Sequence, residues 1–276
     1  MLMGLNGATT MKNADLITDI YLAEKTNYDL LEIWKAKLND YLSQKDLASL
    51  VNLLAGAKIN PYAINSIENI TFRNKEGFGQ IKDEILRLSE IAHRIKCKYL
   101  VVVPSDKLPD ITKREIIEES VNSLRQLSKI ALDYDIAIAF EFMGREDSSV
   151  NNLATCWDII KTVDFDNVGL VIDTFHFYLG NSSLESLRRV EPEKIFIFHI
   201  NDSEDLPRDE LEDKNRLLPG KGIIPLREIA RRLQGIGYSK MVSVELFRPE
   251  YWGWDPEKLA REARQTTMSV LKGLFF

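Results

Sequence analysis

The chain has 276 residues, of which 45% are apolar and 28% charged, and its formal net charge is −6. These proportions are ordinary for a soluble globular protein, and the acidic balance argues against nucleic acid as a partner. No apolar run approaches the ~18 residues of a membrane span, and the N-terminus lacks the basic and apolar regions of a signal peptide. We therefore expect a cytoplasmic protein with no membrane association.

Short apolar runs alternate with amphipathic stretches along the chain, in eight units. The expected strands, each with the helix that follows it, are in order 3–7 and 13–26, 28–34 and 43–57, 58–67 and 81–95, 98–104 and 112–134, 136–142 and a helix after Asn151, 168–174 and 183–189, 194–200 and 225–236, and 241–247 and 256–274. The strands are apolar at successive positions, as parallel strands covered on both faces are. The length is close to the ~250 residues of a barrel of eight such units. The sequence predicts an α/β protein with one (β/α)8 TIM barrel domain over residues 1–276.

Local signals refine three places in this pattern. Thr112, with Glu115 three residues on, is typical of a capped helix start. Cys97 and Cys156 have no C-x-x-C spacing, which predicts two free buried thiols in a reducing compartment. The connection 201–222 is long, charged and rich in glycine near its end, so we expect a lid or wall over a site, with a solvated insertion as the alternative.

Four of the expected strands end in a residue type that binds metals. These residues are Glu141, Asp173, His199 and Glu245. Burying a lone carboxylate costs several kcal/mol unless it is paired or bound to a metal. Because the C-terminal ends of barrel strands face one mouth, we expect the four side chains to converge on one divalent cation. Three oxygen donors and one nitrogen suit Mn²⁺, Zn²⁺, Co²⁺ or Mg²⁺, and the set alone does not choose among them.

Further candidates lie near the same strand ends. His176 follows Asp173 by three residues and is expected to face a substrate, or else to cap a loop. Arg248 follows Glu245 and is expected to clamp a substrate oxygen, or else to form a structural ion pair. Trp34 is a candidate for stacking on a sugar-like ring, with a core position as the alternative, and Lys221 for lining the lid, with an exposed position as the alternative.

Other chemistries lack the residues they need. The chain shows no Ser-His-Asp order and no phosphate-binding glycine loop, because PGKG lacks the length and the preceding strand of one. Three histidines are too few for a histidine-rich multinuclear zinc cluster. The segment 250–254, EYWGW, is open to interpretation as a lid, a rim or a subunit contact in a homo-oligomer.

The segments DTFHFYLG, FIFHINDSED, PGKG and VSVELFRPEYW resemble the xylose isomerase-like barrels, a superfamily of sugar isomerases and epimerases. Within it the chain is most similar to the inosose isomerases of bacterial inositol catabolism, over essentially its whole length. The resemblance implies metal ligands at Glu141, Asp173, His199 and Glu245. It also implies a substrate-contacting histidine at His176 and an arginine at Arg248.

The resemblance further implies a reaction. A ketone moves to the adjacent carbon of a polyol ring through a cis-enediolate, from 2-keto-myo-inositol to 1-keto-D-chiro-inositol. Glu141 and Glu245 are implied as the base and the acid, without an order between them.

Three alternatives stay open: a ketose 3-epimerase or another sugar isomerase, a non-catalytic ligand-binding barrel, and a phosphodiesterase of the AP-endonuclease type. Related epimerases carry an arginine shortly after the histidine that corresponds to His199. Here NDSEDLP has Asp202 and Asp205 instead, which argues against the epimerase.

Overall fold

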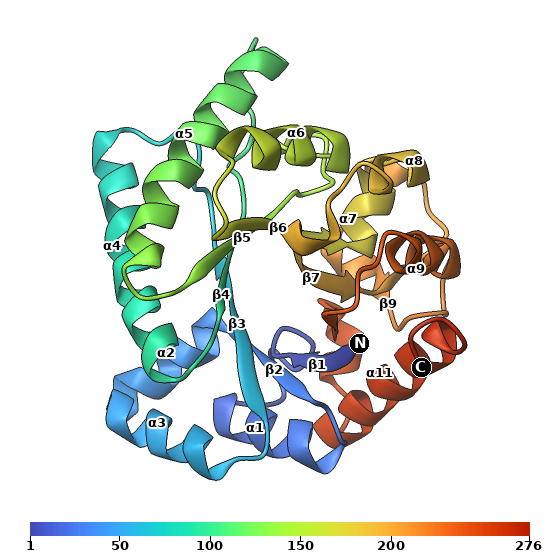
Figure 1. Ribbon diagram of the computed structural model, residues 1–276. Helices are drawn as coiled ribbons and strands as arrows, with labels where there is room; N and C mark the ends of the chain where they lie inside the picture. Colours follow the sequence, from blue (N-terminus) through green and yellow to red (C-terminus); the bar gives the residue numbers. More distant parts are fainter.

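Eight parallel strands close into a barrel that is ringed by helices in the computed structural model, which describes residues 1–276 (Figure 1). Each barrel strand pairs with the next one along the chain, and the first pairs with the last. The barrel strands are β1 (Leu2–Asn6), β2 (Leu30–Trp34), β3 (Asn60–Ile67), β4 (Tyr99–Val102), β5 (Ala137–Glu141), β6 (Val168–Asp173), β7 (Ile195–Ile200) and β10 (Met241–Val244). The predicted (β/α)8 TIM barrel is confirmed.

The helices lie outside this barrel and cover its strands. They are α1 (Leu16–Lys25), α2 (Lys35–Gln44), α3 (Leu47–Gly56), α4 (Lys75–Arg94), α5 (Lys113–Leu132), α6 (Leu153–Val163), α7 (Thr174–Leu179), α8 (Leu184–Leu187), α9 (Leu226–Gly235), α10 (Pro249–Trp252) and α11 (Pro256–Leu271). No helix combines the length and the hydrophobicity that a bilayer-crossing segment requires.

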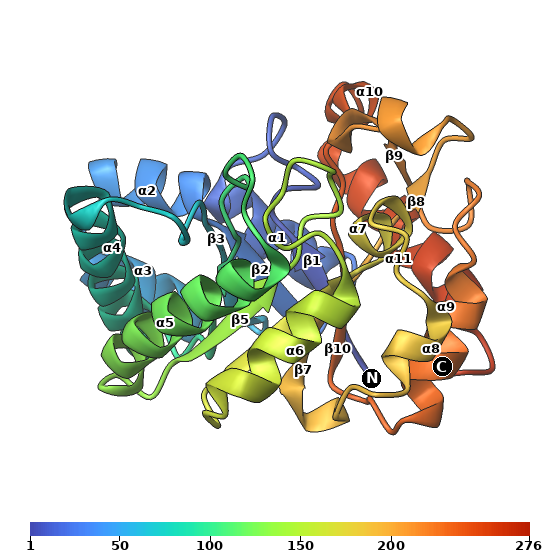
Figure 2. The same ribbon diagram turned by 90° about the horizontal axis from the view of Figure 1, so that it is seen from above.

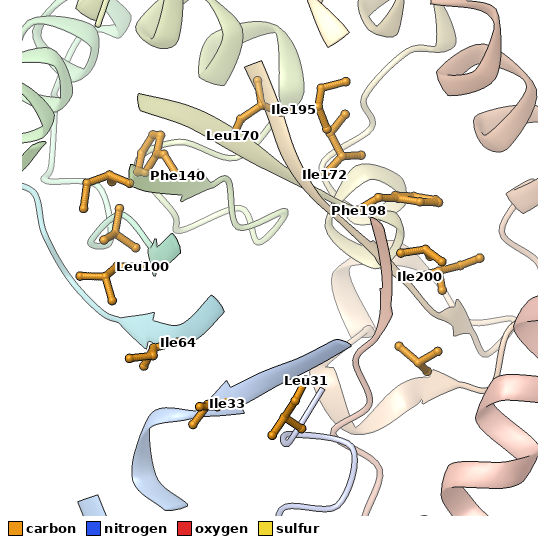
Figure 3. Packing of buried hydrophobic residues seen from close by; sticks show 14 of the residues in the cluster. Leu31, Ile33, Ile64, Leu100, Phe140, Leu170, Ile172, Ile195, Phe198 and Ile200 are labelled. Carbon is orange, nitrogen blue, oxygen red and sulfur yellow. The ribbon is translucent and has the colours of Figure 1, made fainter. Parts of the chain in front are cut away.

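Both faces of the strands are buried, as the continuous apolar runs predict. One set of alternate residues packs outward against the helices in the main core, among them Leu31, Ile64, Leu100, Phe140 and Phe198 (Figure 3). The other set forms a small apolar cluster inside the barrel, with Leu30, Ala63, Val101, Ala139, Val171, Ile197 and Met241. Residues two apart on a strand point to the same face. The next inward positions therefore form a layer above this cluster, and most of them are polar: Glu32, Asn65, Glu141, Asp173 and His199.

Two predicted helices have different bounds in the structure. The expected helix 43–57 is α3, which begins only at Leu47 because the chain is extended at Lys45 and Asp46 caps the helix by accepting from Ser49 N; the preceding helix α2 was not predicted. Helix α4 begins at Lys75, not at residue 81, because Asn74 caps it by accepting from the N–H of Gly77. By contrast, the expected capping box of Thr112 and Glu115 is present at the start of α5.

Two short helices at the mouth were not predicted. Helix α7 begins directly after β6, where the Asp173 carboxylate accepts from the N–H of His176. Helix α10 follows β10 in the segment 250–254, and its Tyr251 hydroxyl accepts from the N–H of Leu218 at 3.4 Å. That contact packs the segment against the end of the 201–222 connection.

The connection 201–222 is buried at 201–203 and mostly buried at 215–219, and it is exposed at 207–210, so the solvated insertion describes only part of it. It contains two short antiparallel strands, β8 (Asp202–Ser203) and β9 (Arg216–Leu217), on the side where the barrel strands end (Figure 2). The buried Asp202 carboxylate accepts from the N–H groups of Gly220 and Ile224 at 3.0 and 2.9 Å, which ties the two ends of the connection together.

Candidate metal and substrate site

The four predicted metal ligands converge at the C-terminal mouth of the barrel. Glu141, Asp173, His199 and Glu245 each offer a donor atom, and these atoms all lie within 4.8 Å of one another. All four side chains are buried, at 4% exposure or less. They come from four strands that are neighbours around the barrel, and it is this adjacency that brings residues distant in sequence together.

The imidazole of His199 lies between two groups of carboxylates. Its Nδ1 is 3.2 Å from Glu141 Oε1 and 3.5 Å from Glu245 Oε2. Its Nε2 faces the opposite way and lies 3.0 Å from both carboxylate oxygens of Glu32. Burial alone would lower the pKa of His199, but Glu32 and Glu245 outweigh it and raise the pKa well above its ordinary value.

Arg216 is the second cationic group of the site. Its Nη1 donates to Asp173 Oδ2 at 3.1 Å and to Glu245 Oε2 at 2.9 Å. The guanidinium is packed between the rings of Phe175 and Phe247, with its carbon 5.0 and 4.9 Å from their centroids. Strand β9 thus inserts a buried cation from the 201–222 connection into the mouth of the barrel.

The buried charges fit a divalent cation. Four fully buried carboxylates (Glu32, Glu141, Asp173 and Glu245) meet two cationic groups, Arg216 and a protonated His199. Burial, with Glu141 as a close neighbour, raises the pKa of Glu245 to about 8. The negative charges of Glu141 and Asp173 add to this rise in pKa, and a cation among the four donors would offset them directly.

A cavity of about 460 Å³ opens over this cluster. The residues that line it are Trp34, Asn65, Ser66, Glu68, Asn69, Val103, Pro104, Asp106, Glu141, Met143, Arg145, His176, Asp213, Arg216, Glu245 and Phe247. Glu141 and Glu245 are among them, whereas Asp173 and His199 lie behind. Two of the four donors are therefore placed to contact a bound molecule as well as a cation.

His176 lines this cavity from α7. Burial and the Arg216 guanidinium lower its pKa, so the imidazole is neutral. Arg216 Nη2 lies 3.1 Å from Nε2 of His176, which must accept that hydrogen bond because the guanidinium can only donate. The ring proton is then on Nδ1, a buried atom with no partner in the protein. His176 thus retains one hydrogen-bond donor that no group of the protein uses.

Trp34 also lines the cavity, at the end of β2, and meets Phe247 edge to face with 5.6 Å between the ring centroids. Arg248 and Lys221 are not among the lining residues. Arg248 Nη1 donates to Glu204 and its Nε to Glu250, both at 2.7 Å, which is the structural ion pair named above as the alternative. Lys221 is exposed.

Two site residues went unrecognised in the sequence. Glu32 carries the same signal as the four ligands, a carboxylate inside an apolar strand, and could have been found that way. Arg216 carries no local signal, because its strand has two residues and follows a charged connection. The two free, buried thiols, Cys97 and Cys156, match the prediction and lie outside this site.

Comparison with known proteins agrees with this architecture. The family model for the xylose isomerase-like TIM barrel matches residues 20–270. The inosose isomerase of Bacillus licheniformis is 40% identical over 276 residues, which are 100% of this chain and 99% of that protein. A crystal structure of the IOLI protein with a zinc atom has a TM-score of 0.97 at 39% identity and covers 100% of this chain and 99% of its own.

A D-psicose 3-epimerase of Enterocloster bolteae is more distant, at 27% identity over 80% of this chain and 73% of its own. The family match and the full-length relatives place the chain without ambiguity. The chain belongs to the xylose isomerase-like TIM barrel family.

Proposed function

We propose that this protein is a divalent-metal-dependent inosose isomerase of the cytoplasm. It would move the ketone of 2-keto-myo-inositol to the adjacent ring carbon and give 1-keto-D-chiro-inositol. The observation that carries the proposal is the pair Glu141 and Glu245, which belong to the donor cluster and also line the cavity. The full-length relatives named inosose isomerase, and the zinc atom in the IOLI structure, support the same activity.

The residues present fit one cation. Glu141, Asp173, His199 and Glu245 would hold it, since their donor atoms already cluster and the buried charge is in excess. When bound, a divalent cation supplies Lewis acidity that polarises the substrate carbonyl and acidifies the neighbouring C–H.

Proton transfer falls to Glu141 and Glu245. One carboxylate takes the proton from the hydroxyl-bearing carbon next to the ketone, and a carboxylate returns a proton to the former carbonyl carbon, while the hydroxyl proton passes to the former carbonyl oxygen. Asn65 Nδ2 donates to Glu245 Oε1 at 2.7 Å, so this carboxylate is held in place by both the amide and Arg216. No comparable donor side chain holds Glu141 apart from His199.

Substrate binding falls to His176, Trp34 and Arg216, which surround the same cavity. The imidazole of His176 lines the cavity and would contact a hydroxyl or carbonyl oxygen of the substrate. The half-buried ring of Trp34 offers an apolar face to the polyol ring.

Ketose 3-epimerisation is the second candidate, and Arg216 favours it. The missing arginine after His199 argued against an epimerase, yet the structure brings an arginine from β9 into the site. Both reactions remove a proton from a carbon between a carbonyl and a hydroxyl. They differ in the carbon to which the proton returns.

NMR of the metal-loaded enzyme in heavy water separates the candidates. With 2-keto-myo-inositol we expect conversion to a second inosose, with deuterium at the new C–H. Epimerisation of D-fructose or D-tagatose without turnover of the inosose would make the protein an epimerase, and no exchange with any of them would leave a binding protein. Metal analysis should give one ion per chain, whereas about three would point to the phosphodiesterase.

A further inference from the structure

Glu32 is a fully buried carboxylate that the proposed reaction does not use. It lies on β2, between Leu31 and Ile33, which pack outward into the main core. Its own side chain points into the barrel and is 0% exposed. A carboxylate in such a place costs several kcal/mol of free energy unless a partner stabilises it.

The partner of Glu32 is a single atom. Both of its carboxylate oxygens lie 3.0 Å from Nε2 of His199, and no other hydrogen bond to this carboxylate is present. Nδ1 of the same ring faces Glu141 and Glu245. Glu32 therefore approaches the imidazole from the side opposite the metal-donor cluster, so it is not a fifth ligand.

A histidine that binds a metal must be neutral and must present a lone pair, while its other nitrogen keeps the proton. A carboxylate that accepts from this second nitrogen selects the tautomer and fixes the plane of the ring. In this protein the groups lie in that order: the carboxylate of Glu32, the imidazole of His199, and then the cluster of metal donors.

We propose that Glu32 is a positioning residue for the metal ion. It accepts the Nε2–H of His199 and so directs the Nδ1 lone pair toward Glu141, Asp173 and Glu245. The inference rests on the proposed metal site, and it assigns the cation to Nδ1 and the proton to Nε2.

Three variants test it, with zinc as the probe and a chromophoric chelator as competitor. Glu32→Leu removes the acceptor, and we expect zinc affinity to fall about 10- to 100-fold. Glu32→Gln keeps the shape and one acceptor oxygen but loses the charge, so its affinity should lie between that of Glu32→Leu and the wild type. Leu30→Ala is the matched control, because Leu30 points inward from the same strand one layer away; it should lose stability but keep its zinc affinity.

Histidine-selective ¹⁵N NMR gives a readout that looser packing would not produce. In the zinc-loaded wild type we expect a slowly exchanging proton on Nε2 of His199 and a zinc-shifted Nδ1. In Glu32→Leu the Nε2 proton should exchange fast with solvent. If the leucine variant does not fold, the same measurement on Glu32→Gln tests the proposal.

The two proposals fail differently. A wild type that binds no zinc refutes the metal site, and with it the role of Glu32. If the wild type binds zinc tightly, three results would each refute the role of Glu32 alone. Both Glu32 variants bind zinc as tightly as the wild type, Leu30→Ala weakens binding as much as Glu32→Leu does, or the ring proton of His199 is on Nδ1.

Discussion

Glu245 carries the first test at the scale of single residues. Glu245→Gln keeps the side-chain volume and an oxygen that accepts from Asn65 Nδ2, so the fold should persist. The amide cannot take a proton from carbon, so exchange of substrate hydrogen with heavy water should be abolished, measured by NMR against an unchanged circular dichroism spectrum. Glu204→Gln is the control, since Glu204 pairs with Arg248 outside the cavity and its loss should leave exchange intact. Full exchange by Glu245→Gln would remove Glu245 from the proton-transfer pair.

The two arginines near the mouth should behave differently. The guanidinium of Arg216 is buried and contacts Asp173, Glu245 and His176, and Arg216→Lys replaces it with a single ammonium group. We expect kcat/KM to fall on the order of 10- to 100-fold, which is the effect of losing a hydrogen bond to a charged group. Arg248→Lys should change it by less than about 3-fold, because a partly exposed ion pair contributes little. Steady-state kinetics of both variants checks this, and a larger loss at Arg248 would return that residue to the substrate site.

A carboxylate or imidazole at the end of an apolar strand predicted the donor cluster, because the barrel brings the ends of neighbouring strands close together. When parallel strands form a closed barrel, a carboxylate or imidazole at the end of any strand lies at the same mouth of the barrel. Glu32 was missed although the same signal applies to it, since it is third from the end of the expected strand 28–34, as Glu245 is of 241–247. Arg216 escaped for a different reason: its place depends on how the 201–222 connection folds back over the mouth, which no local pattern encodes.

At the scale of elements, the strands were easier to predict than the helices. Strands buried on both faces have continuous apolar runs, so their existence and order follow directly from the sequence. Short mouth helices such as α7 and α10 have four to six residues and no hydrophobic period of their own. Helix α7 is stabilised at its start by Asp173, whose carboxylate accepts from the N–H of His176.

The 201–222 connection offers a test at this scale. Both carboxylate oxygens of Asp202 accept from backbone N–H groups, those of Gly220, Ile224 and Ser203. Asp202→Asn replaces one of these oxygens by an amide NH₂ group, so a buried donor then faces another donor. We expect a loss of about 1–3 kcal/mol in the free energy of unfolding by urea, and a lower kcat/KM because Arg216 belongs to the same segment. Asp205→Asn is the control, because Asp205 is exposed. Equal stability of the two variants would contradict a structural role for Asp202.

At the scale of the whole molecule, the closed barrel gathers the charged side chains of the site in one layer at its mouth. The strands bury an apolar layer below the mouth and leave a polar layer above it, so the carboxylates meet one another where water is excluded. The fold alone stabilises each charge poorly, and the stability of the protein is therefore linked to whatever neutralises the cluster.

That linkage predicts how pH and zinc act together on thermal stability. Without metal, Glu245 has a folded pKa of about 8 against an unfolded value near 4.5, and the pKa of His199 is likewise raised. Groups with raised pKa values stabilise the fold fully below their unfolded pKa and lose that contribution as pH rises through the folded one. The metal-free protein should therefore lose stability between about pH 5 and 8, over the range set by Glu245.

Zinc should act in the opposite sense, because it must displace the protons on Glu245 and His199 and binds more tightly as they leave. At a zinc concentration 100 times Kd, binding adds about 2.7 kcal/mol, which corresponds to roughly 5 °C or more in Tm for a chain of this size. Differential scanning fluorimetry with and without chelator should show the zinc-dependent rise in Tm growing from pH 6 to pH 8.5. A rise that shrinks over that range would mean that zinc binds elsewhere than among these buried groups.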